Sequence, residues 1–168
     1  MAKADCLAMD AAAKKHALRL VPYGLYLAGT RREDGTKQVS LVSWFTQTSF
    51  DPCLVVVGMH REGAAFTAVQ ETGVMALNIL GEDDAETLKG FYKHVDVADG
   101  KAGALDVTYG ETDCPMLPAL PATVELKLVE ITEGGDHAAC IFEVVEAHVH
   151  DDSKKALSHE MCGLHYAG

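Results

Sequence analysis

The stretch SLVSWFTQTSFDPCLVVVGM, from Ser40 to Met59, carries the strongest structural signals in the sequence. Its first part completes a strand that the composition predicts over residues 38–45. Asp51-Pro52 then ends this strand, because proline has no backbone N–H to donate to the hydrogen bonds between strands. The following CLVVVGM is apolar without a break, which predicts a strand over residues 53–59 that is buried on both faces. Two strands with a polar and aromatic connection therefore form the centre of the predicted fold.

The segments before this stretch predict a helix and a hairpin. Residues 5–18 are rich in Ala and Leu, with acidic residues near the N-terminal end and basic residues near the C-terminal end. This order of charges is favourable for the helix dipole. We therefore expect residues 1–19 to form a helical extension. YGLYLA has the composition of a strand over residues 23–28, and the Asp34-Gly35 pair is a strong hairpin turn signal.

Downstream of the central stretch, strands outnumber helices. Helices are predicted over residues 64–71, where Gly73 ends the helix, and over residues 82–92. Strands are predicted over residues 74–80, 124–132 and 137–150, with one short strand over residues 104–109 inside a loop that spans residues 93–113. Strands that follow one another through turns favour a barrel. We expect one domain over residues 1–168, mainly β with helical decorations.

Composition excludes several functional classes. The chain has 168 residues, with 14 Lys and Arg against 25 Asp and Glu, for a formal net charge of −11. Sequence-independent nucleic-acid binding depends on neutralising phosphates, so we expect no nucleic-acid partner. No stretch approaches the ~20 apolar residues of a membrane helix, and no secretory signal is evident. The five cysteines are far apart and form no C-x-x-C pair, which indicates neither a disulfide framework nor a zinc ribbon. We expect a cytoplasmic protein without a membrane partner.

The connection between the two central strands suits a planar ligand. It combines hydroxyl and amide side chains with flat aromatic rings: Ser43, Trp44, Phe45, Thr46, Gln47, Thr48, Ser49 and Phe50. A planar heteroaromatic ligand needs flat contacts for its ring and donors and acceptors for its edge. The alternative interpretation is a β-bulge or an edge strand that exposes its Thr and Ser side chains to solvent.

Two turns carry further candidate groups. The turn from His60 to Gly63 leaves a buried strand and opens a helix, where free N–H groups beside Arg61 could bind an anion. Alternatively, it is an ordinary turn with a solvated arginine. Asp136 and His137 follow two glycines, either as a carboxylate that orients an imidazole at the mouth of the barrel or as a plain hairpin turn.

Four histidines in the C-terminal part of the chain are further candidate metal ligands: His148, His150, His159 and His165. Their spacing matches no H-E-x-x-H or comparable motif. We therefore expect no metal site and a polar, solvent-exposed setting for His159 and His165.

Several segments together resemble a known family. SWFTQTSFDP (residues 43–52), MALNIL (residues 75–80) and GDH (residues 135–137) resemble, in order and spacing, the flavin reductase-like family of FMN-binding split barrels. They resemble in particular the reductase modules of diflavin flavoproteins and flavoredoxin-type proteins. The closing SHEMCGLHY (residues 158–166) is similar to an H-x-x-x-G-x-x-Y ending. The resemblance covers about residues 20–166, although Cys53 replaces a second proline and Glu62 follows the expected basic position.

The resemblance implies an FMN-binding split β-barrel, with FAD possible, and a role for each matching residue. Ser43, Trp44, Phe45 and Thr46 would lie along the flavin, with Gln47 nearby. Ser49 and Phe50 would wall the pocket where the chain turns. His60 and Arg61 lie where such proteins place a basic residue near the flavin phosphate. Asp136 and His137 match the motif associated with the nicotinamide side and are the candidate catalytic residues.

The activity that the resemblance implies is an NAD(P)H-dependent flavin reductase. NADH or NADPH would be the donor, and free flavin or a partner redox protein the acceptor. The resemblance also implies a homodimer. Two alternatives remain open: a flavoredoxin-like electron-transfer protein with tightly held FMN, and a split barrel that binds another cofactor, such as haem, without catalysis. The colour and absorbance of the purified protein distinguish haem from flavin.

Overall fold

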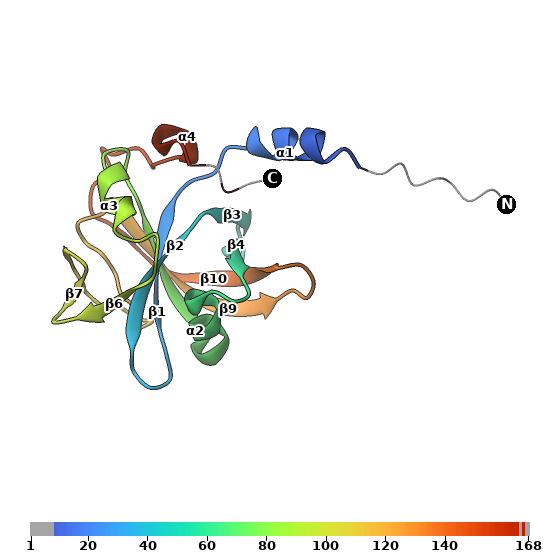
Figure 1. Cartoon of the computed structure of the whole chain (residues 1–168). Coiled ribbons are helices and arrows are strands. Elements are labelled where there is room, and N and C mark those ends of the chain that lie inside the picture. Colours follow the sequence, from blue (N-terminus) through green and yellow to red (C-terminus); the bar gives the residue numbers. More distant parts are fainter. Residues whose placement is uncertain (1–8, 165, 167–168) are drawn as a thin grey trace.

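A ten-stranded antiparallel sheet dominates the computed structural model, which describes residues 9–164 and 166 (Figure 1). The strands are β1 (Tyr26–Arg31), β2 (Lys37–Val42), β3 (Trp44–Ser49), β4 (Leu54–His60), β5 (Val74–Ile79), β6 (Val95–Ala98), β7 (Lys101–Ala102), β8 (Leu105–Asp106), β9 (Ala122–Ile131) and β10 (His137–Val149). Their spatial order is β3-β4-β10-β9-β5-β1-β2-β6-β7-β8, which leaves β3 at an edge. The mainly β prediction is confirmed.

The described residues form four helices beside the sheet: α1 (Ala11–Arg19), α2 (Ala64–Thr72), α3 (Ala85–Lys89) and α4 (His159–Cys162). The prediction of α2 is confirmed, and Gly73 ends it with a φ of 68°, a left-handed conformation that glycine adopts without strain. No helix in the described part of the chain is long and apolar enough to cross a membrane.

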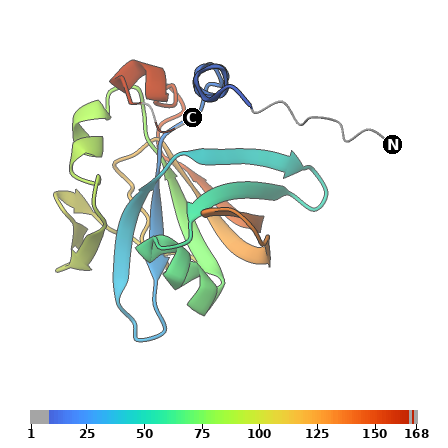
Figure 2. The same ribbon diagram turned by 45° about the vertical axis from the view of Figure 1, so that its right-hand side comes forward.

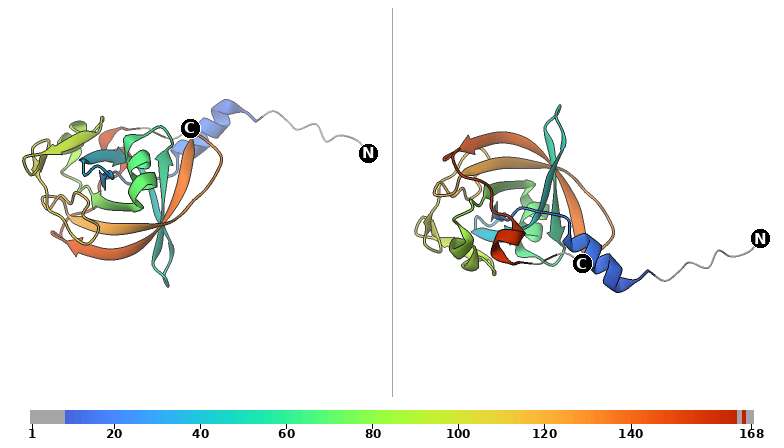
Figure 3. Two further views of the ribbon diagram at one scale, coloured as in Figure 1. Left: turned by 90° about the horizontal axis from the view of Figure 1, so that it is seen from below. Right: turned by 90° about the horizontal axis from the view of Figure 1, so that it is seen from above.

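The N-terminal helix begins later than predicted. The Asp10 carboxylate accepts hydrogen bonds from the amides of Ala12 and Ala13, at 2.8 and 3.2 Å, and so caps the start of α1. Residues 5–8 of the predicted helix lie outside the described residues. α1 buries none of its side chains and projects from the side of the barrel (Figure 3).

Two predictions about the central stretch are wrong. The strand expected over residues 38–45 is two strands, because β2 pairs with β1 whereas β3 pairs with β4, and the chain changes partner at Ser43. β4 is buried on alternate residues rather than on both faces, since one side of the sheet faces the core and the other does not. An apolar run therefore identified the strand but not its surroundings.

Other boundaries also differ. β1 begins three residues later than predicted, and the helix expected over residues 82–92 is reduced to α3. The predicted loop over residues 93–113 contains three short strands, β6 to β8, which extend the sheet beyond β2. β8 lies within the short strand predicted over residues 104–109, whereas β6 and β7 were not predicted. β6 and β7 are four and two residues long, too short for an alternating pattern to reveal them.

The core has two main clusters of buried side chains. One cluster includes Met75, Leu126 and Phe142, and α2 covers it with Phe66 and Val69. The other lies toward α3 and includes the buried residues Leu27, Leu80, Leu88, Leu117 and Leu157. α2 packs against β1, β2 and β4.

The cysteines in the described residues are free thiols: Cys53, Cys114, Cys140 and Cys162. Burial raises the pKa of both Cys114 and Cys140 to about 11. These two thiols are therefore protonated at neutral pH and pack as small apolar groups.

One fully buried carboxylate, that of Glu125, joins two elements of the fold. It accepts hydrogen bonds from the amide and the hydroxyl of Thr112, both at 2.7 Å, and its other oxygen lies 2.8 Å from Nε2 of His148. Gly110 leaves room for this contact, because a Cβ there would lie 2.1 Å from Glu125 Oε1. Burial alone would raise the Glu125 pKa, but the hydrogen bonds from Thr112 and His148 outweigh it and hold the pKa below its ordinary value.

We predict that Glu125→Met lowers the free energy of unfolding at pH 7 by about 1 to 3 kcal/mol, because the buried Thr112 amide loses its acceptor. Because the pKa of Glu125 is lower in the folded state, the ionised carboxylate stabilises the fold fully above the ordinary glutamate pKa of about 4.3. This stabilisation is lost as the pH falls through the pKa of the folded state. The difference from wild type should therefore narrow below pH ~4. Urea denaturation at both pH values measures it. The matched control is Glu143→Met on an exposed β10 position, with a change within about 0.5 kcal/mol. A constant difference across pH would contradict the assignment.

Candidate functional site

A cavity of about 460 Å³, here called the first cavity, lies where β2, β4 and the beginning of β10 meet the start of α2. Leu41, Met59 and Phe66 supply apolar surface from three of these elements. Polar side chains reach the same space from Ser43 and His137. A mainly apolar cavity with a few convergent polar groups is the usual form of a small-molecule site.

His137 is the centre of an aromatic and hydrogen-bonded cluster in the wall of the first cavity. Its Nδ1 lies 3.0 Å from a carboxylate oxygen of Asp136, and its Nε2 lies 2.8 Å from the hydroxyl of Tyr166. Its ring packs against Trp44 and His60, with ring centroids 4.8 and 4.9 Å apart. The imidazole is thus held from both nitrogens and from both sides.

The charges in this cluster influence one another. The hydrogen bond from His137 holds the pKa of Asp136 below its usual range. Burial, and to a lesser extent the Asp136 charge, raises the pKa of Tyr166. At neutral pH the cluster therefore contains an ionised carboxylate and a protonated phenol, with the imidazole between them.

Trp44 reaches this cluster because the neighbouring strand carries glycine. Trp44 pairs with Gly58 of β4, and a Cβ at Gly58 would lie 2.9 Å from the indole ring. The indole also lies against Tyr166, with ring centroids 5.4 Å apart. Trp44 therefore packs behind His137 and Tyr166 and does not itself line the cavity.

Arg61 has a different surrounding from the one predicted. Its guanidinium donates to the carbonyl oxygens of Thr132, Gly134 and Gly135, at 2.7 to 3.1 Å, and its own amide donates to the Asp136 carbonyl. It is not among the residues that line the first cavity. The side chain thus fixes the turn that precedes His137, and the structure does not bring it to the cavity beside His60.

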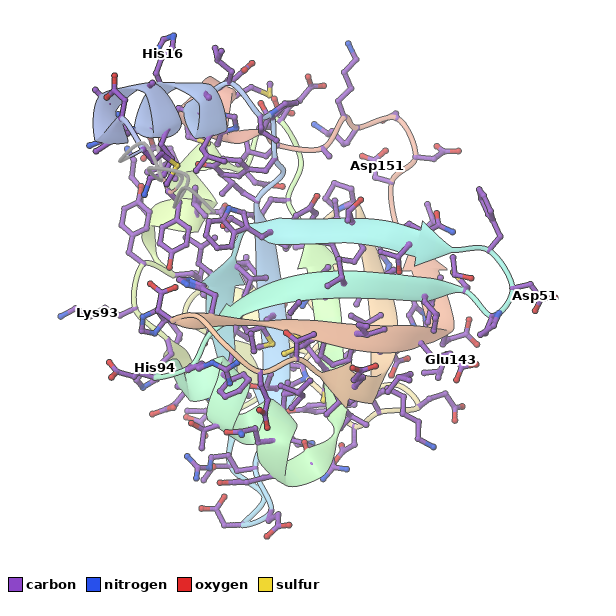
Figure 4. The ribbon with its side chains drawn as sticks, turned by 90° about the vertical axis from the view of Figure 1, so that its right-hand side faces the viewer. His16, Asp51, Lys93, His94, Glu143 and Asp151 are labelled. Carbon is purple, nitrogen blue, oxygen red and sulfur yellow. The ribbon has the colours of Figure 1, made fainter. Side chains whose placement is uncertain are left out.

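The remaining predicted residues of β3 lie away from the first cavity. Phe45 packs against Tyr26, with ring centroids 5.1 Å apart, while Thr46 and Gln47 are exposed on the edge strand. Ser49 and Phe50 lie at the tip of the β3–β4 hairpin, and Phe50 is 92% exposed. Figure 4 shows Asp51, at this tip, on the opposite side of the molecule from His94, which lines the cavity. For these residues the structure matches the edge-strand interpretation within a single chain.

Sequence analysis missed several residues that line the first cavity. Tyr23 and Leu25 enter it from the segment before β1, and Phe91, Tyr92 and His94 enter it from the segment after α3. No local motif distinguishes these residues, because tertiary packing alone brings their segments to the cavity. The aromatic content of residues 91–94 was the one available signal.

His159 is buried, contrary to the prediction of a surface setting. Its side chain is 2% exposed and its ring stacks on Tyr23, with centroids 3.9 Å apart. It thereby anchors the C-terminal segment beside the first cavity. His148 and His150 lie together on β10 and just beyond it, and His165 lies outside the described residues. Within residues 9–164 and 166, no group of three His, Cys, Asp or Glu side chains is arranged to hold a metal.

Comparison with known proteins agrees with this architecture. The model of the flavin reductase like domain matches residues 18–167. Diflavin flavoprotein A 1 of Nostoc sp. is 32% identical over 157 residues, which cover 89% of this chain and 26% of that protein. An NADH:riboflavin 5'-phosphate oxidoreductase of Streptomyces pristinaespiralis is 29% identical over 126 residues, 75% of this chain and 68% of that protein.

A solved structure shows the same fold. The styrene monooxygenase flavin reductase of Pseudomonas putida superimposes with a TM-score of 0.71 at 21% identity, covering 87% of this chain and 91% of that one. The chain spans 24% to 48% of the length of several curated relatives. The match over nearly all of its residues shows that this chain belongs to the flavin reductase like domain family.

Proposed function

We propose that this protein is an NAD(P)H-dependent flavin reductase that binds FMN in the first cavity. The observation that carries the proposal is the His137 cluster, a held imidazole in the wall of an apolar cavity, in a chain of the flavin reductase like domain family. Similarity to an NADH:riboflavin 5'-phosphate oxidoreductase supports FMN as the flavin and NADH as the donor.

The residues around the first cavity fit a flavin. Leu41, Met59 and Phe66 offer apolar surface for a flat ring system. The start of α2, at Ala64, lines the same space, and N–H groups of a first helical turn favour a phosphate. The buried hydroxyl of Ser40 lines the cavity and has no hydrogen-bond partner within the described residues, so it is available to a polar edge.

When bound, the flavin would supply the redox chemistry by accepting a hydride and passing electrons on. The protein's own residues would bind, orient and shield the reactants. His137, whose Nδ1 donates to the Asp136 carboxylate, would present a fixed Nε2 that accepts a hydrogen bond from the Tyr166 hydroxyl. Tyr166, packed on Trp44, would cover the cavity and reduce the access of water.

Binding is tested by titrating the protein into FMN and following flavin fluorescence. We expect quenching with about one FMN per chain, because each chain has one first cavity. Absence of quenching at micromolar protein would contradict the proposal, and a haem spectrum in the purified protein would favour the cofactor alternative.

Arg61 positions His137 in this proposal, in place of the phosphate contact that the resemblance implied. We predict that Arg61→Ala slows flavin reduction about 10-fold, because the turn before His137 loses three hydrogen bonds. Affinities for FMN and for riboflavin should change by the same factor, as riboflavin lacks only the phosphate. Stopped-flow kinetics and the two titrations measure these effects. A selective loss of FMN affinity would instead assign the phosphate to Arg61.

We further propose a homodimer of single-domain chains, residues 1–168, in the cytoplasm, with residues 1–19 as an extension. Phe50 on the edge hairpin and Leu18 in α1 are exposed apolar side chains that a second copy could cover. The free thiols are consistent with a reducing compartment. Light scattering should give twice the 18.0 kDa chain mass, and the mass of one chain would contradict the dimer.

A further inference from the structure

A second cavity, of about 940 Å³, adjoins the first. It lies between the β1–β2 turn and the β6–β8 segment, and Ala64 and His94 line both cavities. Figures 1 and 2 show the β1–β2 hairpin between α2 and these short strands. A ligand that fills the first cavity can therefore extend past the start of α2 into the second.

Carboxylates give the second cavity its chemical character. Asp34, Asp96 and Asp99 line it from the β1–β2 turn, from β6 and from the turn after β6. Asp96 and Asp99 are exposed to solvent at the cavity. Carboxylates accept hydrogen bonds from sugar hydroxyls, as in the recognition of a ribose diol, and repel phosphates.

The cations of the second cavity are already paired. Arg32 forms a salt bridge with Glu71, and Lys37 forms one with Asp113. The Lys37 ammonium also lies 3.7 Å from the ring centroid of Tyr109, which lines the cavity. Of the three aspartates, Asp34 accepts hydrogen bonds from the amide and the hydroxyl of Thr36 and interacts with the Arg32 charge. The acidic character of the cavity therefore comes mainly from Asp96 and Asp99, which suits a neutral group that carries hydroxyls.

Buried polar atoms without partners lie on β2, which lines both cavities, and on the neighbouring strand β1. Within the described residues, three such atoms occur: Thr30 Oγ1, Gln38 Nε2 and Ser40 Oγ. Gln38 is 7% exposed and lines the second cavity, while Ser40 lines the first, two residues along the same face of β2. Thr30 pairs with Gln38 across the strands. Buried polar groups normally have partners, so this concentration points to a polar ligand or ordered water along β2.

The start of α2 lies at the junction of the cavities. Gly63 caps the helix without a side-chain hydrogen bond, and the first turn contains no acidic residue. The first N–H groups of a helix are unused within it and favour phosphate. The order along this path is therefore an apolar cavity for a ring, a helix start for phosphate and an acidic cavity for hydroxyls.

We propose that the second cavity is an adenosine subsite, which takes the adenosine of a dinucleotide with a free 2'-hydroxyl while the redox ring occupies the first cavity. The inference rests on the function proposed for the first cavity. FAD and NADH share this adenosine and diphosphate chemistry, and the experiment below distinguishes them.

The experiment uses a substitution that fills the second cavity and leaves the residues of the first cavity unchanged. Asp96→Trp places a large ring in the acidic cavity, and Asp152→Trp, at an exposed position outside both cavities, is the matched control. Two ratios are measured for each protein: the affinity for FAD against FMN, and the rate of reduction of bound flavin by NADH against reduced nicotinamide mononucleotide.

The wild type should favour the dinucleotide at least 10-fold in one of the two ratios. Asp96→Trp should abolish that preference and leave FMN affinity within about twofold, which also shows that the variant is folded. Loss of the FAD preference assigns the subsite to the flavin, and loss of the NADH preference assigns it to the nicotinamide donor. Two ratios near one in the wild type, or ratios unchanged by Asp96→Trp, overturn the inference. Failure of the wild type to bind either flavin instead overturns the proposed function.

A second variant tests the carboxylates without adding bulk. Asp96→Asn with Asp99→Asn removes two charges, and asparagine tolerates the positive φ of 51° at residue 99. The wild type should bind AMP and should bind adenosine 2',5'-bisphosphate at least 10-fold more weakly. The double variant should show a smaller ratio between these two affinities. Equal binding of the two nucleotides by the wild type overturns the assignment of the aspartates to the 2'-hydroxyl.

Discussion

Asn78→Leu should lower the free energy of unfolding by about 2 to 6 kcal/mol, at roughly 1 to 3 kcal/mol for each of two buried donors left without an acceptor. Asn78 is fully buried on β5. Its Oδ1 accepts from the amide of Leu117 and the hydroxyl of Thr123, both at 2.8 Å. Its Nδ2 donates to the carbonyls of Leu27 and Pro115, at 3.0 and 3.2 Å. One amide thus joins β1, β5, β9 and the loop before β9.

Urea denaturation measures this effect. The control is Gln70→Leu, the same kind of exchange at an exposed position of α2, with a change within about 0.5 kcal/mol. A loss in Asn78→Leu as small as that of the control would show that the four hydrogen bonds do not stabilise the fold. It would also leave the chain's single asparagine, in the MALNIL segment, without a stabilising role.

His137→Ala should slow the reduction of bound flavin by NADH at least 100-fold, the lower end of the range for a positioned acid or base. The variant removes the imidazole that Asp136 and Tyr166 hold in the wall of the first cavity. Affinity for FMN should change little, because the apolar wall and the start of α2 remain. Anaerobic stopped-flow absorbance measures the rate.

His150→Ala, an exposed histidine just beyond β10, serves as the control and should retain the wild-type rate. Tyr166→Phe removes the hydroxyl alone, and its rate of flavin reduction should lie between the rates of His137→Ala and His150→Ala. If His137→Ala reduces flavin as fast as His150→Ala does, the imidazole has no part in hydride transfer.

The sequence predicted those parts of the fold that local signals determine. α2 was predicted almost to the residue, because Gly63 and Gly73 bound it. β9 and β10 were recognised from alternation and from the glycines between them. The break at Ser43 was missed, since a change of strand partner depends on pairing with β1 and β4 and leaves no mark in composition.

The candidate site could be predicted only in part, because it too depends on contacts between distant segments. Ser43, His60 and His137 were predicted and do line the first cavity. The hydrogen bonds of Arg61 could not be predicted, because a position after a strand does not reveal that carbonyls 71 to 74 residues away will accept from the guanidinium. His159 was assigned to the surface from its polar neighbours, although its ring stacks on Tyr23, 136 residues earlier.

The most direct test of the proposed function is anaerobic mixing of the FMN-loaded protein with NADH, and separately with NADPH. We predict rapid bleaching of the flavin absorbance at about 450 nm by NADH, with one electron pair transferred per bound flavin. Bound FMN that keeps its oxidised spectrum with both nicotinamides would contradict the reductase and leave a flavin-binding protein reduced by some other partner.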